Sequence, residues 1–186
     1  MDQRLLWFIL VAVIVSAALA VWLSLRRQRS RHLRERFGPE YERTLERAGD
    51  QRHAEAELEA REKRVAKIEI HPLSEGESTR FWDRWLTIQK RFVDSPRESV
   101  AEADRLVIEV MEARGYPMAD FEQRAADVSV HHPQVVSNYR AARAIAERGE
   151  RSQAGTEELR KAVVYYRDLF EELLEAPRAA RAGGKR

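Results

Sequence analysis

A run of 21 residues without a charged side chain, residues 5–25 (LLWFILVAVIVSAALAVWLSL), constrains the fold of this chain more than any other feature. At about 1.5 Å per residue, a helix of this length crosses a hydrocarbon core roughly 30 Å thick. Trp7 and Trp22 lie near the two ends of the run, and tryptophan favours the headgroup boundary because its apolar ring carries one N–H donor. The sequence therefore predicts that residues 1–25 form a transmembrane anchor.

The same run could instead belong to a cleaved export signal. Ala18, Leu19 and Ala20 have the small–x–small pattern of a cleavage site. However, the apolar run continues beyond Ala20, and the strong positive charge follows the run rather than preceding it. We therefore favour an uncleaved anchor, whereas cleavage after Ala20 would make the protein a secreted or periplasmic helical domain.

A basic juxtamembrane segment, residues 26–38, follows the run. Only Arg4 precedes the run, whereas six arginines follow it: Arg26, Arg27, Arg29, Arg31, Arg34 and Arg36. Lys and Arg beside a span are retained on the cytoplasmic side, which predicts a protein of the cytoplasmic (inner) membrane with its N-terminus outside and its C-terminal domain in the cytoplasm. The arginines could also contact anionic lipid headgroups, at about 1 kcal/mol each, although we favour a topology signal alone.

The net positive charge of the chain comes from its two ends. Residues 37–175 hold 22 Lys and Arg against 29 Asp and Glu, a net charge of −7, although the whole chain has a net charge of +2. An acidic body would repel a phosphate backbone, and we therefore expect no nucleic-acid partner. The chain has no cysteine, which excludes disulfides, thiolate zinc sites and a cysteine nucleophile.

Three segments follow the basic segment. Residues 39–70 are very polar with a thin apolar stripe and a break at Gly49 and Asp50, which predicts a solvated helix or helix pair. Residues 71–175 carry helical apolar stripes separated by Pro and Gly, which predict a small antiparallel helical bundle. Residues 176–186 lack an apolar pattern and are expected to be disordered. The predicted fold class is therefore all-α, with one N-terminal transmembrane helix followed by the bundle.

Local signals predict where the bundle helices begin and end. Ser74 and Glu77 match a capping box, Pro96 and Pro133 suit first helical positions, and Gly115 suits a C-terminal cap. The helix opened by the capping box places four large apolar side chains on one face: Phe81, Trp85, Ile88 and Phe92. We expect this face to lie in the core.

Two stretches of the chain carry a resemblance to known sequences. Residues 115–143 (GYPMADFEQRAADVSVHHPQVVSNYRAAR) and residues 37–50 (FGPEYERTLERAGD) resemble a family of uncharacterised bacterial proteins. Members of that family have a single N-terminal span followed by a helical domain, so the resemblance implies this architecture over most of the chain, and a bacterial origin. The family has no known activity, so the resemblance implies no functional residue.

Asp127, His131 and His132 form a weak candidate site. Asp127 and His131 have a metal-ligand spacing for a helix, but β-branched residues and a proline within residues 128–133 oppose helix there. Adjacent histidines in irregular backbone tend to point apart, and no H-E-x-x-H pattern completes a zinc site. We therefore expect a local turn, with no metal, no cofactor and no catalytic residue.

The functional prediction is a non-enzymatic interaction module, anchored in the membrane and facing the cytoplasm, with an unidentified protein partner. No Gly-rich phosphate loop and no G-x-S-x-G motif is present in the sequence. The alternative is a ligand-binding, metal-binding or catalytic helical domain centred on residues 120–139.

Overall fold

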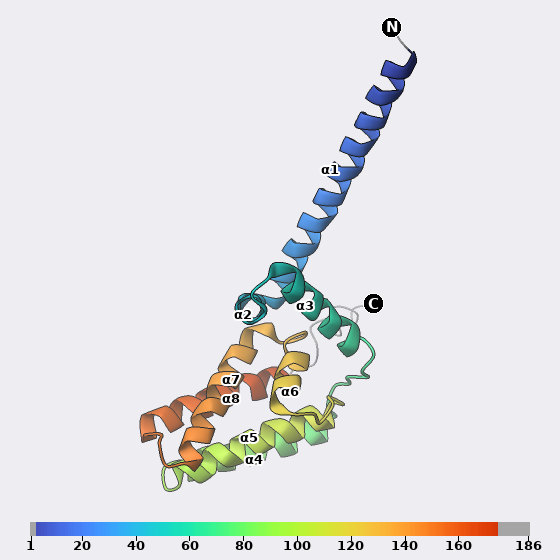
Figure 1. Ribbon diagram of the computed structural model, residues 1–186. Coiled ribbons are helices and arrows are strands. Elements are labelled where there is room, and N and C mark those ends of the chain that lie inside the picture. The colour runs from blue at the N-terminus through green and yellow to red at the C-terminus, as the bar shows by residue number, and fades with distance from the viewer. Residues whose placement is uncertain (1–2, 175–186) are drawn as a thin grey trace. The chain divides into compact units, whose positions relative to one another are not determined.

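The computed structural model describes residues 3–174, and within them the chain forms eight helices and no strand. The helices are α1 (Gln3–Phe37), α2 (Pro39–Ala48), α3 (Gln51–Val65), α4 (Glu75–Arg91), α5 (Pro96–Ala113), α6 (Phe121–Val128), α7 (Pro133–Glu150) and α8 (Thr156–Leu174) (Figure 1). The predicted all-helical fold is confirmed. The chain divides into two compact units, Met1–Leu58 and Glu59–Arg186. The predicted disorder of residues 176–186 concerns a segment outside the described residues.

The prediction of a transmembrane helix is wrong. No helix in the described part of the chain, residues 3–174, is long and apolar enough to cross a membrane. The apolar run does not form a helix of its own, because α1 continues through the arginines to Phe37, over 35 residues. Arginine is nearly as good a helix former as leucine, so the change of side chains does not end the helix. The predicted orientation, with the N-terminus outside and the C-terminal domain in the cytoplasm, required a helix that crosses the membrane and therefore loses its basis.

Glycine and proline end the helices of the first unit. α1 stops before Gly38, whose φ of 47° is left-handed, and Pro39 opens α2. Gly49, with a φ of 68°, caps α2, and its N–H donates to the carbonyl of Leu45. The Asp50 carboxylate then accepts from two N–H groups of the first turn of α3, at 3.0 and 3.2 Å. The predicted break at Gly49 and Asp50 is confirmed.

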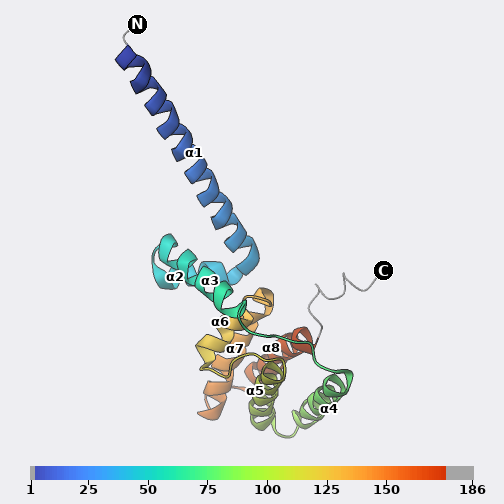
Figure 2. The same ribbon diagram turned by 90° about the vertical axis from the view of Figure 1, so that its right-hand side faces the viewer.

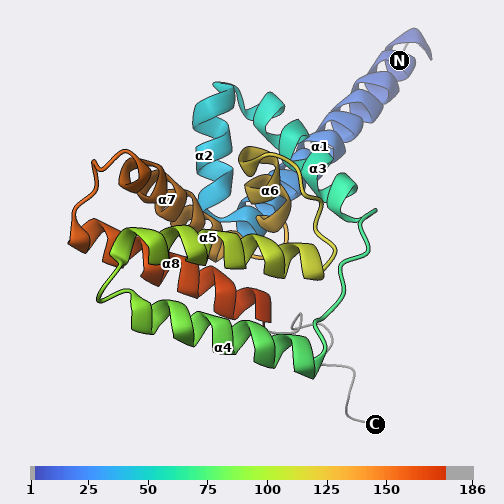
Figure 3. The same cartoon turned by 90° about the horizontal axis from the view of Figure 1, so that it is seen from below.

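The second unit contains the helical bundle. α5 packs against α4, α7 and α8, and α8 also packs along α7; α4, α5 and α8 lie side by side in Figure 3. The short helix α6 packs on α7 (Figure 2). Large aromatic and aliphatic side chains fill the space between these helices, including Trp85, Leu106, Tyr139, Tyr166 and Phe170. The predicted bundle is confirmed.

The predicted start and buried face of α4 are also confirmed. The Ser74 hydroxyl accepts from the Glu77 N–H at 3.3 Å, and the Glu77 carboxylate accepts from the Ser74 N–H at 2.9 Å, which completes the capping box. Trp85 and Ile88 are buried. Phe81 and Phe92 are partly buried against the same core, which identifies the inward face of the helix.

Candidate functional site

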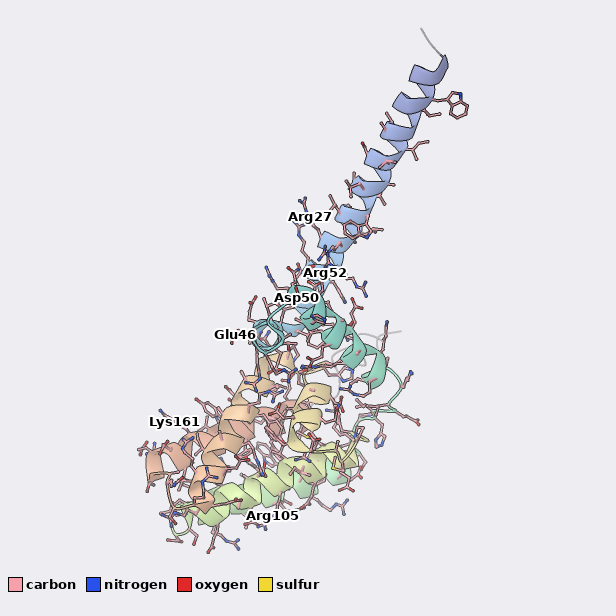
Figure 4. All side chains as sticks on the ribbon, in the orientation of Figure 1. Arg27, Glu46, Asp50, Arg52, Arg105 and Lys161 are labelled. Carbon is pink, nitrogen blue, oxygen red and sulfur yellow. The ribbon has the colours of Figure 1, made fainter. Side chains whose placement is uncertain are left out.

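The arginine-rich part of α1 lines an open pocket of about 320 Å³ within the first unit. Its lining residues on α1 recur every three or four positions, so they lie on one helical face: Leu23, Arg26, Arg27, Ser30, Arg31 and Arg34. Gln51, the first residue of α3, completes the lining. Arg27 extends from α1 in Figure 4. We call this feature the arginine pocket.

A small hydrogen-bond network holds α3 against α1 beside the arginine pocket. The Gln51 amide donates to the Ser30 hydroxyl at 3.2 Å and to the Glu55 carboxylate at 2.8 Å. The Tyr41 hydroxyl donates to the same carboxylate at 3.0 Å. Burial alone would raise the pKa of Glu55, but the hydrogen bonds and the charge of Arg26 together hold it below its ordinary value. Glu55 is therefore a buried carboxylate that is ionised at neutral pH.

The arginines of the pocket differ in how far their charge is compensated. Arg26 stacks over the Trp22 ring at 5.5 Å and interacts electrostatically with Glu55. Arg34 lies 3.6 Å from the Glu42 carboxylate and stacks over the Tyr41 ring at 5.0 Å.

Arg27 and Arg31 form no ion pair with any acidic group in the described part of the chain. Arg29 and Arg36, which the sequence also suggested as lipid contacts, do not line the pocket. The structure thus brings four of the six arginines together, and two of these lack a counter-charge.

Asp127 is occupied by structural contacts. It is buried, and its Oδ1 accepts from Arg64 Nε at 2.9 Å, from Arg64 Nη2 at 2.7 Å and from the Gln123 amide at 2.9 Å. Two of these bonds form a charge-assisted fork from one guanidinium. This carboxylate therefore ties the end of α3 to α6 within the second unit.

His131 and His132 do not converge on a common point. His131 is exposed, and its Nδ1 lies 3.3 Å from the Tyr116 hydroxyl. His132 is buried, and its Nδ1 lies 3.4 Å from the Glu172 carboxylate. The two rings are 6.3 Å apart and inclined at 71°. Among residues 3–174 no three His, Asp or Glu side chains are grouped to hold a metal ion.

A second open pocket, of about 490 Å³, lies where α5 and α8 begin. Its lining includes Asp94, Ser95, Glu98 and Thr156, and neither it nor the arginine pocket includes Asp127, His131 or His132. The candidate site from the sequence therefore contributes to neither pocket.

The buried tyrosines of the second unit are not poised for proton transfer. Burial raises the pKa of Tyr116 to about 12 and also raises the pKa of Tyr139 and of Tyr166. Asp104 adds to the effect on Tyr166, and its own Oδ2 accepts from Arg143 Nη1 at 2.7 Å. A general acid or base works best with a pKa near the operating pH, and these phenols are far above it.

His132 is expected to make the stability of the protein depend on pH. Burial lowers its pKa below the ordinary value, although the nearby Glu172 opposes that shift. The unfolded chain therefore binds a proton at a pH near 6.5 at which the folded chain does not, and the free energy of unfolding falls as the pH decreases from 7 to 5. For one proton the slope reaches about 1.4 kcal/mol per pH unit. Urea unfolding followed by circular dichroism across this range measures it.

A matched pair of histidine variants tests that assignment. His132→Gln should flatten the slope between pH 7 and pH 5 because it removes the titrating group. His131→Gln should leave most of the slope in place, because the buried ring of His132 remains. Carboxylates whose pKa is lowered, such as Glu77 and Glu109, change the free energy of unfolding at lower pH, near and below their ordinary pKa of 4.5. A slope that persists in His132→Gln would contradict the assignment.

The arginines stand out in the sequence, but Gln51, which completes the pocket, and Glu55, which accepts a hydrogen bond from Gln51, do not. Gln51 and Glu55 lie 21 and 25 positions beyond Ser30 and read as ordinary polar residues of a solvated helix. The one local signal was the recurrence of Arg and Ser every three or four residues along residues 23–34. That spacing indicates a shared face but not what lies beside it.

Comparisons with known proteins do not assign the chain to a family. No family model matches it, and neither a curated protein nor a solved structure shows significant similarity to it. The resemblance seen in residues 37–50 and 115–143 therefore stays a prediction.

Proposed function

We propose that this protein is a non-enzymatic interaction module that associates with anionic lipid through α1 and presents its helical bundle to a protein partner. The proposal needs no helix that spans the bilayer. It assigns lipid contact to the apolar and basic parts of α1, and partner contact to the surface of the second unit.

The exposed apolar length of α1 is the observation that carries the proposal. Ten large apolar side chains between Trp7 and Leu25 are each between 40% and 63% exposed. Soluble monomers rarely expose a continuous apolar surface of this kind, and such surfaces mark contact with a membrane or with another protein. The arginines follow directly along the same helix, and an apolar surface beside a basic one suits the boundary between lipid tails and anionic headgroups.

The charge of the arginines favours one side of a cell membrane. The cytoplasmic leaflet carries a negative surface potential that attracts basic segments beside an apolar one. We therefore propose that the protein acts at the cytoplasmic face of the inner membrane, with the acidic body in the cytoplasm.

The surface of the bundle supports a protein partner rather than a reaction. Trp82 and Leu86 lie one turn apart on α4 and are 39% and 38% exposed, and Val93 beyond the helix is 82% exposed. Aromatic side chains are enriched in protein interfaces, and exposed apolar patches mark sites of interaction. Within residues 120–139, by contrast, the Asp127 carboxylate accepts hydrogen bonds from Arg64 and Gln123, and His132 lies beside Glu172.

Removing apolar surface from α1 is expected to weaken lipid binding. Val15→Ser/Leu19→Ser replaces two side chains that are 60% and 53% exposed. Burying a large aliphatic side chain is worth about 1.5–3 kcal/mol, so the double variant should partition onto vesicles about 100-fold less well. Sedimentation of the full chain with vesicles of phosphatidylcholine, with and without phosphatidylglycerol, measures the partition.

A control with similar substitutions in the second unit distinguishes lipid binding by α1 from nonspecific hydrophobic adsorption. Val93→Ser/Val164→Ser removes two exposed aliphatic side chains from the second unit and should leave vesicle binding unchanged. Added salt should weaken binding to the anionic vesicles more than to the neutral ones, because salt screens only the charged part of the attraction. Equal losses in the two double variants, or no binding to either vesicle, would refute the proposal.

A further inference from the structure

The arginine pocket holds more positive charge than its acidic neighbours neutralise. Four arginines line it, and the carboxylates that face them are Glu42, which lies beside Arg34, and Glu55, which interacts with Arg26. Two positive charges, on Arg27 and Arg31, are left without a counter-charge in the described part of the chain. The pocket therefore favours an anion that carries about two negative charges.

The placement of these two arginines is unfavourable unless an anion is present. Arg27 and Arg31 are four residues apart, so their guanidinium groups leave the same face of α1 one turn from each other. Like charges at this spacing repel each other and destabilise a helix. Both side chains are exposed at the pocket, and a guanidinium can donate two parallel hydrogen bonds to a phosphate.

We propose that the arginine pocket binds the phosphate group of a phosphomonoester lipid headgroup, with Arg27 and Arg31 as its principal ligands. This inference rests on the proposed function, which brings α1 to a lipid surface. A phosphomonoester carries nearly two negative charges at neutral pH and three acceptor oxygens, which matches the two uncompensated arginines. A phosphodiester headgroup carries one charge and leaves one of them unpaired.

The position of the pocket along α1 favours a lipid over a free phosphate as the source. Leu23 belongs to the exposed apolar part of α1 and also lines the pocket, and Arg26 follows it by one turn. Trp22, next to Leu23, stacks with Arg26 at 5.5 Å, and tryptophan rings are enriched at the headgroup boundary. The arginines therefore begin where the apolar surface ends, which is where headgroup phosphates lie.

The test compares two anionic lipids at equal surface potential. Vesicles of phosphatidylcholine receive either phosphatidic acid, a phosphomonoester, or phosphatidylglycerol, a phosphodiester, in amounts adjusted to the same zeta potential. The full chain should partition onto the phosphatidic acid vesicles about tenfold better, the gain expected from an additional charge-assisted hydrogen bond. The preference should fade as the pH is lowered from 7 to 5, because the second pKa of a phosphomonoester is about 6.

Matched variants locate the preference in the pocket. Arg27→Gln/Arg31→Gln should abolish the preference for phosphatidic acid vesicles over phosphatidylglycerol vesicles. Arg43→Gln/Arg52→Gln removes the same charge from exposed residues of the first unit that do not line the pocket and should preserve it; Arg52 is labelled in Figure 4. Circular dichroism checks that both variants keep the helical content of the parent chain.

Each contrary result has a distinct meaning. Equal binding to the two anionic vesicles would overturn the phosphomonoester site while leaving general lipid association intact. A preference that survives in Arg27→Gln/Arg31→Gln would overturn the assignment to this pocket. Binding of glycerol 3-phosphate in solution, without any preference among vesicles, would overturn a lipid as the source of the phosphate. Failure to bind any anionic vesicle would instead refute the proposed function.

Discussion

Replacing Trp85 with alanine is expected to lower the free energy of unfolding of the helical bundle by about 3–5 kcal/mol. Trp85 is fully buried, and its ring stacks on Phe170 of α8 with 4.9 Å between the ring centres. Truncation removes this contact between α4 and α8 and leaves a cavity that the rigid helices cannot fill. Urea or thermal unfolding followed by far-UV circular dichroism measures the loss.

The neighbouring tryptophan supplies a matched control. Trp82 also stacks on Phe170, with 5.9 Å between the ring centres, but it is 39% exposed. Trp82→Ala should therefore cost well under half as much as Trp85→Ala, because less apolar surface returns to water and no closed cavity forms. Comparable losses in the two variants would show that the inward face of α4 has been assigned incorrectly.

Local signals in the sequence predicted much of the bundle because their physical causes lie within a few residues. The capping box of Ser74 and Glu77 needs only one helical turn, and both of its hydrogen bonds form. Pro96 and Pro133 open α5 and α7 as expected, since the missing N–H of proline costs nothing at a first helical position. The spacing of Trp85 and Ile88 identified the buried side of α4 for the same local reason.

Features that depend on distant residues could not be predicted in the same way. Nothing near Asp127 indicated that Arg64, 63 positions earlier, would form a fork of hydrogen bonds to it. The pocket beside α1 depends on Gln51, which reaches Ser30 only because Gly49 and Asp50 turn the chain between α2 and α3.

The transmembrane prediction failed for another reason. The prediction treated residues 5–25 as a segment with ends of its own. In the structure these residues belong to a longer helix whose last third is strongly basic.

Gly115 combines two conditions that exclude a side chain. Its φ of 89° lies in the left-handed region, and it follows the last residues of α5 in a Schellman motif. In that motif the Gly115 N–H donates to the Glu112 carbonyl at 2.9 Å and the Tyr116 N–H donates to the Met111 carbonyl at 3.0 Å. A Cβ at this position would also lie 2.5 Å from the carbonyl oxygen of Glu69, in a segment that is held in place by a hydrogen bond from the His71 N–H to the Arg114 carbonyl, at 3.1 Å.

Two other glycines allow these conditions to be separated. Gly49 also has a left-handed φ, of 68°, but a Cβ there would meet no atom within 4 Å, so Gly49→Ala should cost only the backbone strain, about 1–2 kcal/mol. Gly76 lies in α4, has no left-handed φ and has open space around it. Gly76→Ala should be neutral or stabilising by up to about 1 kcal/mol, because alanine restricts the unfolded chain and favours helix.

Gly115→Ala is therefore expected to destabilise the bundle by about 3 kcal/mol, from about 1–2 kcal/mol of backbone strain and about 1–3 kcal/mol of overlap with the Glu69 carbonyl. Gly115→Asn tests the second contribution, since asparagine tolerates a left-handed φ but carries the same Cβ. It should remain clearly destabilising at position 115, whereas Gly49→Asn should be nearly neutral. The free energy of unfolding in urea decides between the two contributions. If Gly115→Asn proved as stable as the parent chain, the segment at Glu69 could not be packed against the end of α5 as closely as the structure shows.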